Sequence, residues 1–385
     1  MSNAINLIVS AGPHARYDTP VSIDLGDAVK GQTQAKLSET DTARSIPCQL
    51  DGTRLFFVVP GLGENEERPL KLELGAESAR HGGVKLTDKK EEGLSVEISG
   101  KPFTTYRYQP AGEFPVKARP FFYPVYGAGG AGMTRNFPMK DLPGETKDHP
   151  HHRGLWVAFG DVNGTDNWSE GPDHGYQTHQ RFSEILSGPV CGRFVEELHW
   201  EDKAHNKVCE ETRTFVTWNL PQDQRLIDLT VSFRANPGPL RFGDTKEGGI
   251  CSIRVPCSLE SGRGRIENAA GGVGEGETWG RAAHWVDYSG IVEGQPLGVA
   301  IMDHPFNLRH PTPWHVRSYG LFSANPFAHS YYKASHLQDG SFSVPVGGAL
   351  TFRYRVYFHR GDRRRGDVAG KWNDYAFAPV VKRAE

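Results

Sequence analysis

The chain has 385 residues, a formal net charge of -2, 45 glycines and 26 prolines. A nearly neutral chain without a basic face excludes an electrostatic nucleic-acid interface, and no apolar run reaches the roughly 18 residues of a membrane-spanning helix. The five cysteines show no CxxC spacing, which fits a reducing compartment. We therefore expect a cytoplasmic protein that binds neither nucleic acid nor membrane.

The predicted elements are strands almost throughout. Residues 1–90 carry short runs such as TRLFFVVPG and LKLELG, divided by turn residues, and predict a small β-sandwich-like region. Residues 91–385 carry longer alternating runs such as RLIDLTVSFRA and predict a large antiparallel β-sandwich domain that holds the site. The clearest helical candidate is DVAGKWNDYAF, near the end. The predicted fold class is all-β.

A glycine-rich stretch, GAGGAG at 127–132, satisfies the G-x-G-x-x-G pattern of dinucleotide sites. A dinucleotide site would need a helix directly after this stretch. The following MTRNFPMKDLPG contains two prolines, which are incompatible with such a helix. We read a loop here, and no cofactor is required by the sequence.

The segment KDHPHHRG, at 147–154, precedes the apolar run LWVAF, which is typical of a strand buried on both faces. In an extended leader, His149 and His151 share one face and His152 the other. An H-x-H pair is a half-site for a divalent metal, with His304 as a further ligand. The alternatives are acid/base or substrate-binding histidines, and histidines that only support the structure.

A charged cluster precedes another strand in GDTKEGGICSIRVP. The carboxylate of Glu247 beside Lys246 can be held ionised as a base, and the glycines let a substrate approach the backbone. The alternative is a charged turn.

Residues 277–290 and 302–327 interleave aromatic, basic, acidic and amide side chains in turn-rich sequence. Indole faces stack on sugar rings, and guanidinium and carboxylate groups bind hydroxyls, so this composition indicates a carbohydrate site. The alternative is that these side chains serve ordinary packing. The candidate binding residues from these segments are Trp279, Arg281, His284, Asp303, Trp314, His315 and Asn325.

Four motifs, DHPHHRGLWVAFGDVNG, GDTKEGGICSIRVP, GRAAHWVDYSG and DHPFNLRHPTPWHVRSYGLFSANPF, resemble the bacterial family labelled "methane oxygenase PmoA-like", a domain of unknown function. The resemblance covers roughly residues 95–375. Members of that family look like companions of sugar-oxidising dehydrogenases, which implies a carbohydrate substrate. The strand pattern is also loosely similar to galactose-mutarotase-like supersandwiches.

We predict a carbohydrate-active enzyme that uses general acid/base catalysis at or near the anomeric centre: a glycosidase, lyase or epimerase acting on a small-molecule or oligosaccharide substrate. The predicted catalytic residues are Glu247 as the base, His151 or His152 as the acid, and Asp148 orienting a histidine. The predicted substrate-binding residues add Arg153 and Lys246 to the candidates above.

Two alternatives stay open. One is a hydrolase or lyase with a divalent metal on His149, His151 and His304, and the other is a carbohydrate-binding protein without catalysis. The sequence is compatible with an oligomer.

Overall fold

The computed structural model describes residues 4–76, 82–260, 262–332 and 338–384. The all-β prediction is confirmed, because strands in large antiparallel sheets dominate the chain. The described residues include two short α-helices, α1 (Gly274–Thr278) and α2 (Val368–Ala376). Short 3-10 turns lie at Gly26–Val29, Lys90–Glu92, Ala128–Gly130 and Cys257–Leu259. No helix in the described ranges is long and apolar enough to cross a membrane.

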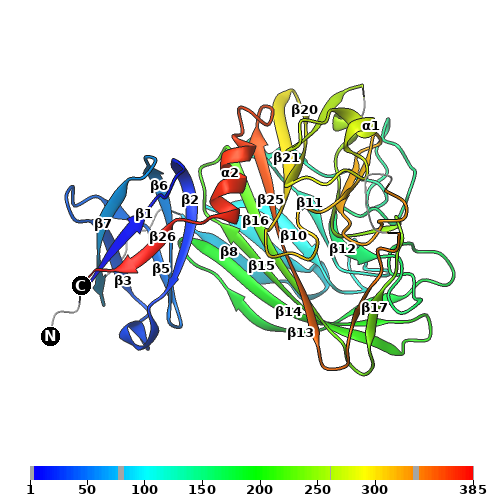
Figure 1. The fold of residues 1–385 in the computed structure, drawn as a ribbon, viewed down its shortest axis with the longest axis horizontal. Coiled ribbons are helices and arrows are strands. Elements are labelled where there is room, and N and C mark those ends of the chain that lie inside the picture. Colours follow the sequence, from blue (N-terminus) through cyan, green and yellow to red (C-terminus); the bar gives the residue numbers. More distant parts are fainter. Residues whose placement is uncertain (1–3, 77–81, 261, 333–337, 385) are drawn as a thin grey trace.

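A small sandwich lies at one end of the molecule (Figure 1). Its first sheet has the order β26 (Val380–Arg383), β1 (Ala4–Ser10), β7 (Glu67–Leu74), β3 (Ala35–Glu39) and β4 (Ser45–Ile46). The second has the order β2 (Arg16–Asp24), β6 (Arg54–Leu62) and β5 (Cys48–Asp51). Alternate side chains such as Leu7, Leu37, Phe57 and Leu72 fill the space between them. The C-terminal strand β26 pairs with β1, so both ends of the described chain meet in this sandwich.

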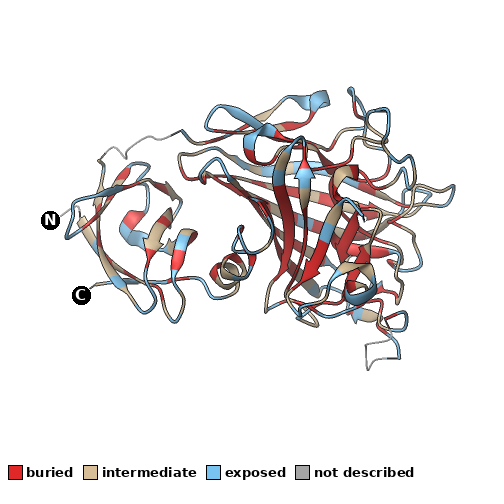
Figure 2. Ribbon diagram, turned by 90° about the horizontal axis from the view of Figure 1, so that it is seen from above, coloured by how far each residue is buried: buried red, intermediate tan, exposed pale blue. Residues whose placement is uncertain are grey.

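The large sandwich packs two eight-stranded sheets face to face (Figure 1). The first, which we call the site sheet, has the order β22 (Trp314–Arg317), β23 (Leu321–Ala324), β18 (Gly248–Arg254), β12 (Leu155–Phe159), β11 (Phe121–Val125), β10 (Lys101–Arg107), β9 (Leu94–Ile98) and β8 (Val84–Asp88). The second, the long sheet, has the order β13 (Tyr176–Leu186), β14 (Cys191–Glu201), β15 (Lys207–Trp218), β16 (Gln224–Arg234), β25 (Ala349–Arg360), β21 (Gln295–Asp303), β20 (Trp285–Val292) and β19 (Gly264–Asn268). A two-stranded ribbon pairs β17 (Leu240–Phe242) with β24 (Phe342–Val344). Buried residues follow the strands through the centre (Figure 2).

The central strand β12 is buried on both faces, as the sequence predicted. Leu155 and Val157 point into the core between the sheets, whereas Trp156 and Ala158 belong to a second apolar cluster on the outer face of the site sheet. Trp168 belongs to the same cluster and comes from a connecting segment. Connecting segments therefore cover the outer face of the site sheet. Polar side chains on this face can lie among aromatic rings.

Helix α2 lies between the two sandwiches in Figure 1, at the position predicted from its sequence. Its Asp374 receives hydrogen bonds from Arg16 Nη1 at 3.1 Å and from Thr19 Oγ1 at 2.8 Å, both on β2. Because Arg16 and Asp374 are buried, this ion pair joins the helix firmly to the small sandwich.

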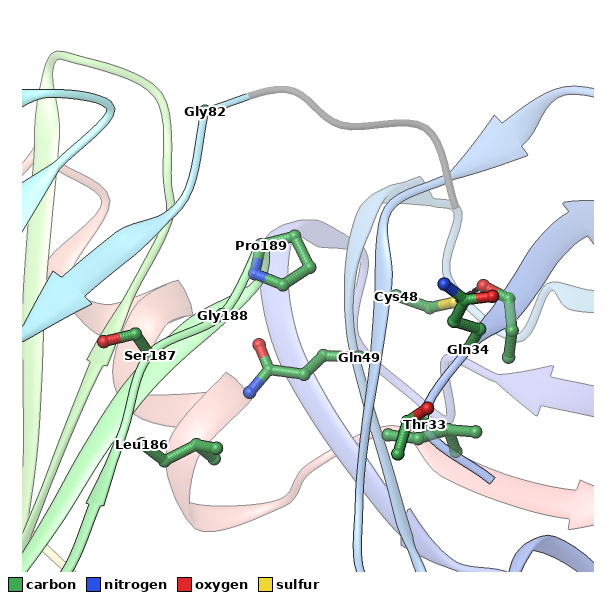
Figure 3. Close-up of a pocket in the computed structure, with 11 residues that line it drawn as sticks. Thr33, Gln34, Cys48, Gln49, Gly82, Leu186, Ser187, Gly188 and Pro189 are labelled. Atoms are coloured by element: carbon green, nitrogen blue, oxygen red, sulfur yellow. Dashed lines mark hydrogen bonds between the residues drawn. The ribbon is translucent and has the colours of Figure 1, made fainter. Parts of the chain in front are cut away.

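A cavity of about 430 Å³ also lies between the sandwiches, lined by Gln34, Cys48, Gln49, Ser187 and Pro189 among others (Figure 3). Gln49 Oε1 accepts hydrogen bonds from the backbone N–H groups of Val190 at 3.2 Å and Cys191 at 3.1 Å. None of the predicted site residues lines this cavity.

Candidate functional site

The structure divides the predicted site residues into two groups. One lies on the outer face of the site sheet and contains Asp148, His149, His151, His152, Arg153, Lys246, Glu247, Trp279, His315 and Asn325. The other lies at the end of β21 and contains His284, Asp303 and His304. Arg281 is exposed. Trp314 is fully buried in the core and its indole N–H donates to the carbonyl of Ala283 at 2.8 Å, so the predicted stacking of this ring on a sugar is wrong.

The histidine segment before β12 forms a turn and not an extended leader. The N–H of His152 donates to the carbonyl of His149 at 3.0 Å, and His149 has a φ of +46°. This turn stacks the His149 ring on that of His152, with centroids 4.8 Å apart, and on Tyr319 at 4.8 Å. The expectation that His149 and His151 share one face of a strand is therefore wrong, because the chain folds back over the sheet.

Asp148 anchors this turn between two buried guanidinium groups. It accepts hydrogen bonds from Arg135 Nη1 at 2.8 Å and from Arg254 Nη2 at 2.9 Å, and it also contacts His149 Nδ1. Burial alone would raise the pKa of Asp148, but the hydrogen bonds from Arg254 and His149 hold it well below its usual range. Asp148 therefore remains an anion in contact with His149, and the orienting role predicted for it stays a prediction.

Three histidines of this group, His151, His152 and His315, are held neutral. Burial, with the charges of Arg119 and His149, lowers the pKa of His151 to about 4, and burial lowers that of His152 far more strongly. Burial and the charge of Arg317 lower the pKa of His315 to about 4. A histidine that is neutral at pH 7 carries no imidazolium proton to donate, so the role of acid predicted for His151 or His152 is not supported by their surroundings.

Glu247 stands at the start of β18, and its carboxylate lies 2.5 Å from Lys246 Nζ. Its side chain keeps 51% of its surface exposed. Partial burial would raise the pKa of Glu247, but the hydrogen bond and charge of Lys246, with the charge of Arg317, lower it below its ordinary value. Glu247 is thus an accessible, ionised carboxylate, as the sequence predicted.

Arg317 contacts three neighbouring side chains, and its charge contributes to the lowered pKa of Glu247. Its Nε donates to His315 Nε2 at 3.2 Å, its Nη1 donates to Glu275 Oε1 at 2.9 Å, and its guanidinium lies 5.7 Å from the Trp279 ring centroid. His315 and Arg317 point to the same face because they are two residues apart on β22. The result is an exposed carboxylate, a neutral imidazole, a guanidinium and an indole in one group.

Two predicted binding residues have their polar atoms occupied by the protein. Arg153 forms a fork onto Glu170, with Nε and Nη2 at 2.8 and 2.9 Å from the two carboxylate oxygens. Asn325 is buried, and its Nδ2 donates to the carbonyl of Thr245 at 3.0 Å. Asn325 therefore positions the loop that carries Lys246 and Glu247.

Several residues of this group were not predicted. Glu170 and Arg119 pair beneath His151, and Glu275 binds Arg317. Arg254 gave the clearest available signal, because it is a charged residue at the end of the otherwise uncharged strand β18. Glu170 stands in a loop and Glu275 in the short, glycine-containing helix α1, and by sequence alone neither carboxylate can be distinguished from a solvated one.

The predicted metal ligands do not meet. Among the described residues, no three His, Cys, Asp or Glu side chains are grouped as a metal ion would require. His304 contacts Phe306 and Tyr375, with centroids 5.1 and 4.9 Å away, and it belongs to the second group. The histidines at 149 and 151 therefore lack the third ligand predicted for them.

The buried His315 predicts a dependence of stability on pH. Its pKa is about 4 in the folded chain and 6.5 ordinarily, so the unfolded chain binds more protons between these values. The free energy of unfolding should therefore fall as pH drops from 6.5 to 4, by at most about 3 kcal/mol from this residue. In His315→Gln the fall between urea melts at pH 7 and pH 4.5 should be smaller, and an equal fall would contradict the expectation.

The comparisons with known proteins find a matching family model and distant solved structures. A family model described as "Family of unknown function (DUF6807)" matches residues 93–373, close to the region that carries the four motifs, and it brings no methane-oxygenase description. No curated protein matches the sequence. Among solved structures, an alpha-galactosidase from Lactobacillus brevis is similar at 8% identity with a TM-score of 0.32; the match covers 74% of this chain and 40% of that one. Because the family model covers most of the chain, the protein belongs to the DUF6807 family of unknown function.

Proposed function

We propose that the protein is a carbohydrate-active lyase or epimerase in which Glu247 removes a proton from a carbon next to a carbonyl or carboxylate group of a sugar. The observation that carries this proposal is the exposed, ionised Glu247 beside Lys246, within the electrostatic influence of Arg317. Such proton removal requires at least a base and adjacent cations. The cations are needed because negative charge develops on the oxygen of the carbonyl or carboxylate group when the proton leaves.

The protonation states favour a base over the acid that a glycosidase needs. Glycoside hydrolysis commonly uses one carboxyl group that is kept protonated by a raised pKa. Here the pKa values of Asp148, Glu170, Glu247 and Glu275 are all lowered, in each case by hydrogen bonds from cationic or backbone N–H groups that outweigh burial. These four carboxylates are anions at neutral pH, so of the three predicted reactions we favour elimination or epimerisation.

The proposed step can be written with the residues of this group. The Glu247 carboxylate takes the proton, and the C–H electron pair forms an enolate whose oxygen is stabilised by Lys246 or Arg317. Elimination then breaks the bond from the adjacent carbon to its leaving oxygen, which takes the proton from Glu247. In epimerisation water instead donates a proton to the opposite face of the enolate carbon, and Glu247 gives its proton to the resulting hydroxide. Trp279 offers its ring for the apolar face of the sugar.

The test is a proton NMR time course in deuterium oxide with mono- and disaccharides and their keto derivatives. For epimerisation the proposal predicts that deuterium replaces hydrogen on the carbon beside the carbonyl. For elimination it predicts loss of that proton signal together with release of the leaving group. Hydrolysis without deuterium at carbon would favour a glycosidase. Line broadening of the ligands without any reaction would favour a carbohydrate-binding protein.

A further inference from the structure

A second group of histidines lies apart from Glu247, at the end of β21. The Asp303 carboxylate is fully buried, and its Oδ2 lies 2.6 Å from His310 Nδ1. The other ring nitrogen of His310, Nε2, lies 3.1 Å from His284 Nδ1. The three side chains form a continuous chain of hydrogen bonds, from a buried carboxylate to the half-buried His284.

The surrounding structure fixes each member of this chain. Asp303 Oδ1 accepts from Asn307 Nδ2 at 2.7 Å, and its Oδ2 also accepts from the N–H of Thr312 at 2.9 Å. The indole of Trp372 stacks on His284 at 4.2 Å and donates to the carbonyl of Asp303 at 2.9 Å. The rings are therefore held in one orientation, which is the arrangement that proton transfer needs.

The hydrogen bonds also determine which nitrogen carries each proton. Both Asp303 oxygens already accept hydrogen bonds, from Asn307 and Thr312, so Asp303 acts as an acceptor towards His310 as well and His310 carries its proton on Nδ1. In a neutral His310, Nε2 is then an acceptor, and it receives the Nδ1 proton of His284. This leaves Nε2 of His284 without a proton at the outer end of the chain.

We infer that Asp303, His310 and His284 form a proton relay, and that Nε2 of His284 accepts a proton from a hydroxyl group, either of a bound ligand or of water. When His284 Nε2 takes the proton, the proton on its Nδ1 passes to His310 Nε2. The positive charge then rests on His310, directly beside the Asp303 carboxylate, which stabilises it.

The surface near the relay suits a ligand with hydroxyl groups and an apolar side. The turn that follows Asp303 presents Phe306 with 79% of its surface exposed, beside His304. Phe306 lies between Asp303 and His310 in the sequence, and its exposed ring offers a face for the apolar side of a sugar-like alcohol. The inference does not rest on the function proposed for Glu247, because the two groups share no residue.

The first test reads the proton positions in the wild-type protein. Two-bond proton–nitrogen NMR spectra of the full chain with ¹⁵N-labelled histidine, at pH 7, should show His284 and His310 both protonated on Nδ1 and unprotonated on Nε2. His284→Gln and His310→Asn assign the signals. A proton on His284 Nε2, in a neutral or a charged ring, would overturn the inference.

The second test reads the reactivity of the same nitrogen. Diethyl pyrocarbonate acylates unprotonated imidazole, and its attack on His284 can be measured by mass spectrometry relative to the exposed His205, which is paired with Glu201. His310→Asn keeps a donor for Asp303 but breaks the link to His284. The ratio of the two rates should fall by about tenfold, the effect of one unit of basicity. An unchanged ratio in the folded variant would show that the chain is only structural.

Discussion

Glu247→Gln should lower the rate of deuterium exchange or turnover by about 10²–10⁴-fold, the usual contribution of a positioned general base. Glutamine keeps the size of the side chain and one acceptor oxygen, but it cannot take a proton. The fold should be unaffected, because the Glu247 side chain is half exposed and its ion pair with Lys246 lies at the surface. The measurement is the proton NMR time course in deuterium oxide, with wild type and variant at equal concentration.

A matched control is available in the small sandwich. Glu73 pairs with Lys71 at 2.7 Å, and both side chains are about as exposed as those of Glu247 and Lys246. Glu73→Gln removes an equivalent surface ion pair far from the site sheet, and it should leave turnover unchanged. Equal activity of wild type and Glu247→Gln would remove Glu247 as the base. An equal loss in both variants would show that the effect is not specific to the site.

The fold class and the central strand could be predicted because both depend on local patterns. Alternating runs specify antiparallel strands, and the continuous apolar run at 155–159 specifies a strand covered on both faces. The pairing of β26 with β1 could not be predicted, because it joins the two ends of the chain. Strand pairing over such a separation has no local sequence signal.

The residues of the candidate site were predicted only in part. The sequence could not show that they divide into two groups, because that division depends on the sheet topology. Residues 279–325 looked like one carbohydrate site in sequence. In the structure, β20 and β21 belong to the long sheet while β22 and β23 belong to the site sheet. His284 and Asp303 therefore separate from His315, although fewer than forty residues cover all three. The ion pair of Glu247 with Lys246 could be expected because the two residues are neighbours in sequence.

Glu211→Gln should have the largest effect on stability. Strand β15 places Glu211 and Arg213 on its inner face, where alternation alone predicts apolar residues. Arg213 donates to the two Glu211 oxygens at 2.5 and 2.7 Å, and the indole N–H of Trp200 donates to one of them at 2.5 Å. Removing the negative charge leaves a fully buried guanidinium without its direct ion-pair partner. We expect a loss of about 3–5 kcal/mol in the free energy of unfolding, measured by urea denaturation at pH 7.

The adjacent residue gives the control for this prediction. Glu210 points to the outer face of β15, where it accepts from Lys207 Nζ at 2.7 Å with a third of its surface exposed. Glu210→Gln should cost no more than about 1 kcal/mol, because solvent screens the pair. Arg213 also donates to Tyr106, whose hydroxyl contacts the buried Glu196. Equal stability of Glu211→Gln and Glu210→Gln would contradict this prediction. It would mean that the negative charge of Glu196, acting through Tyr106, is enough to stabilise the buried Arg213 guanidinium without Glu211.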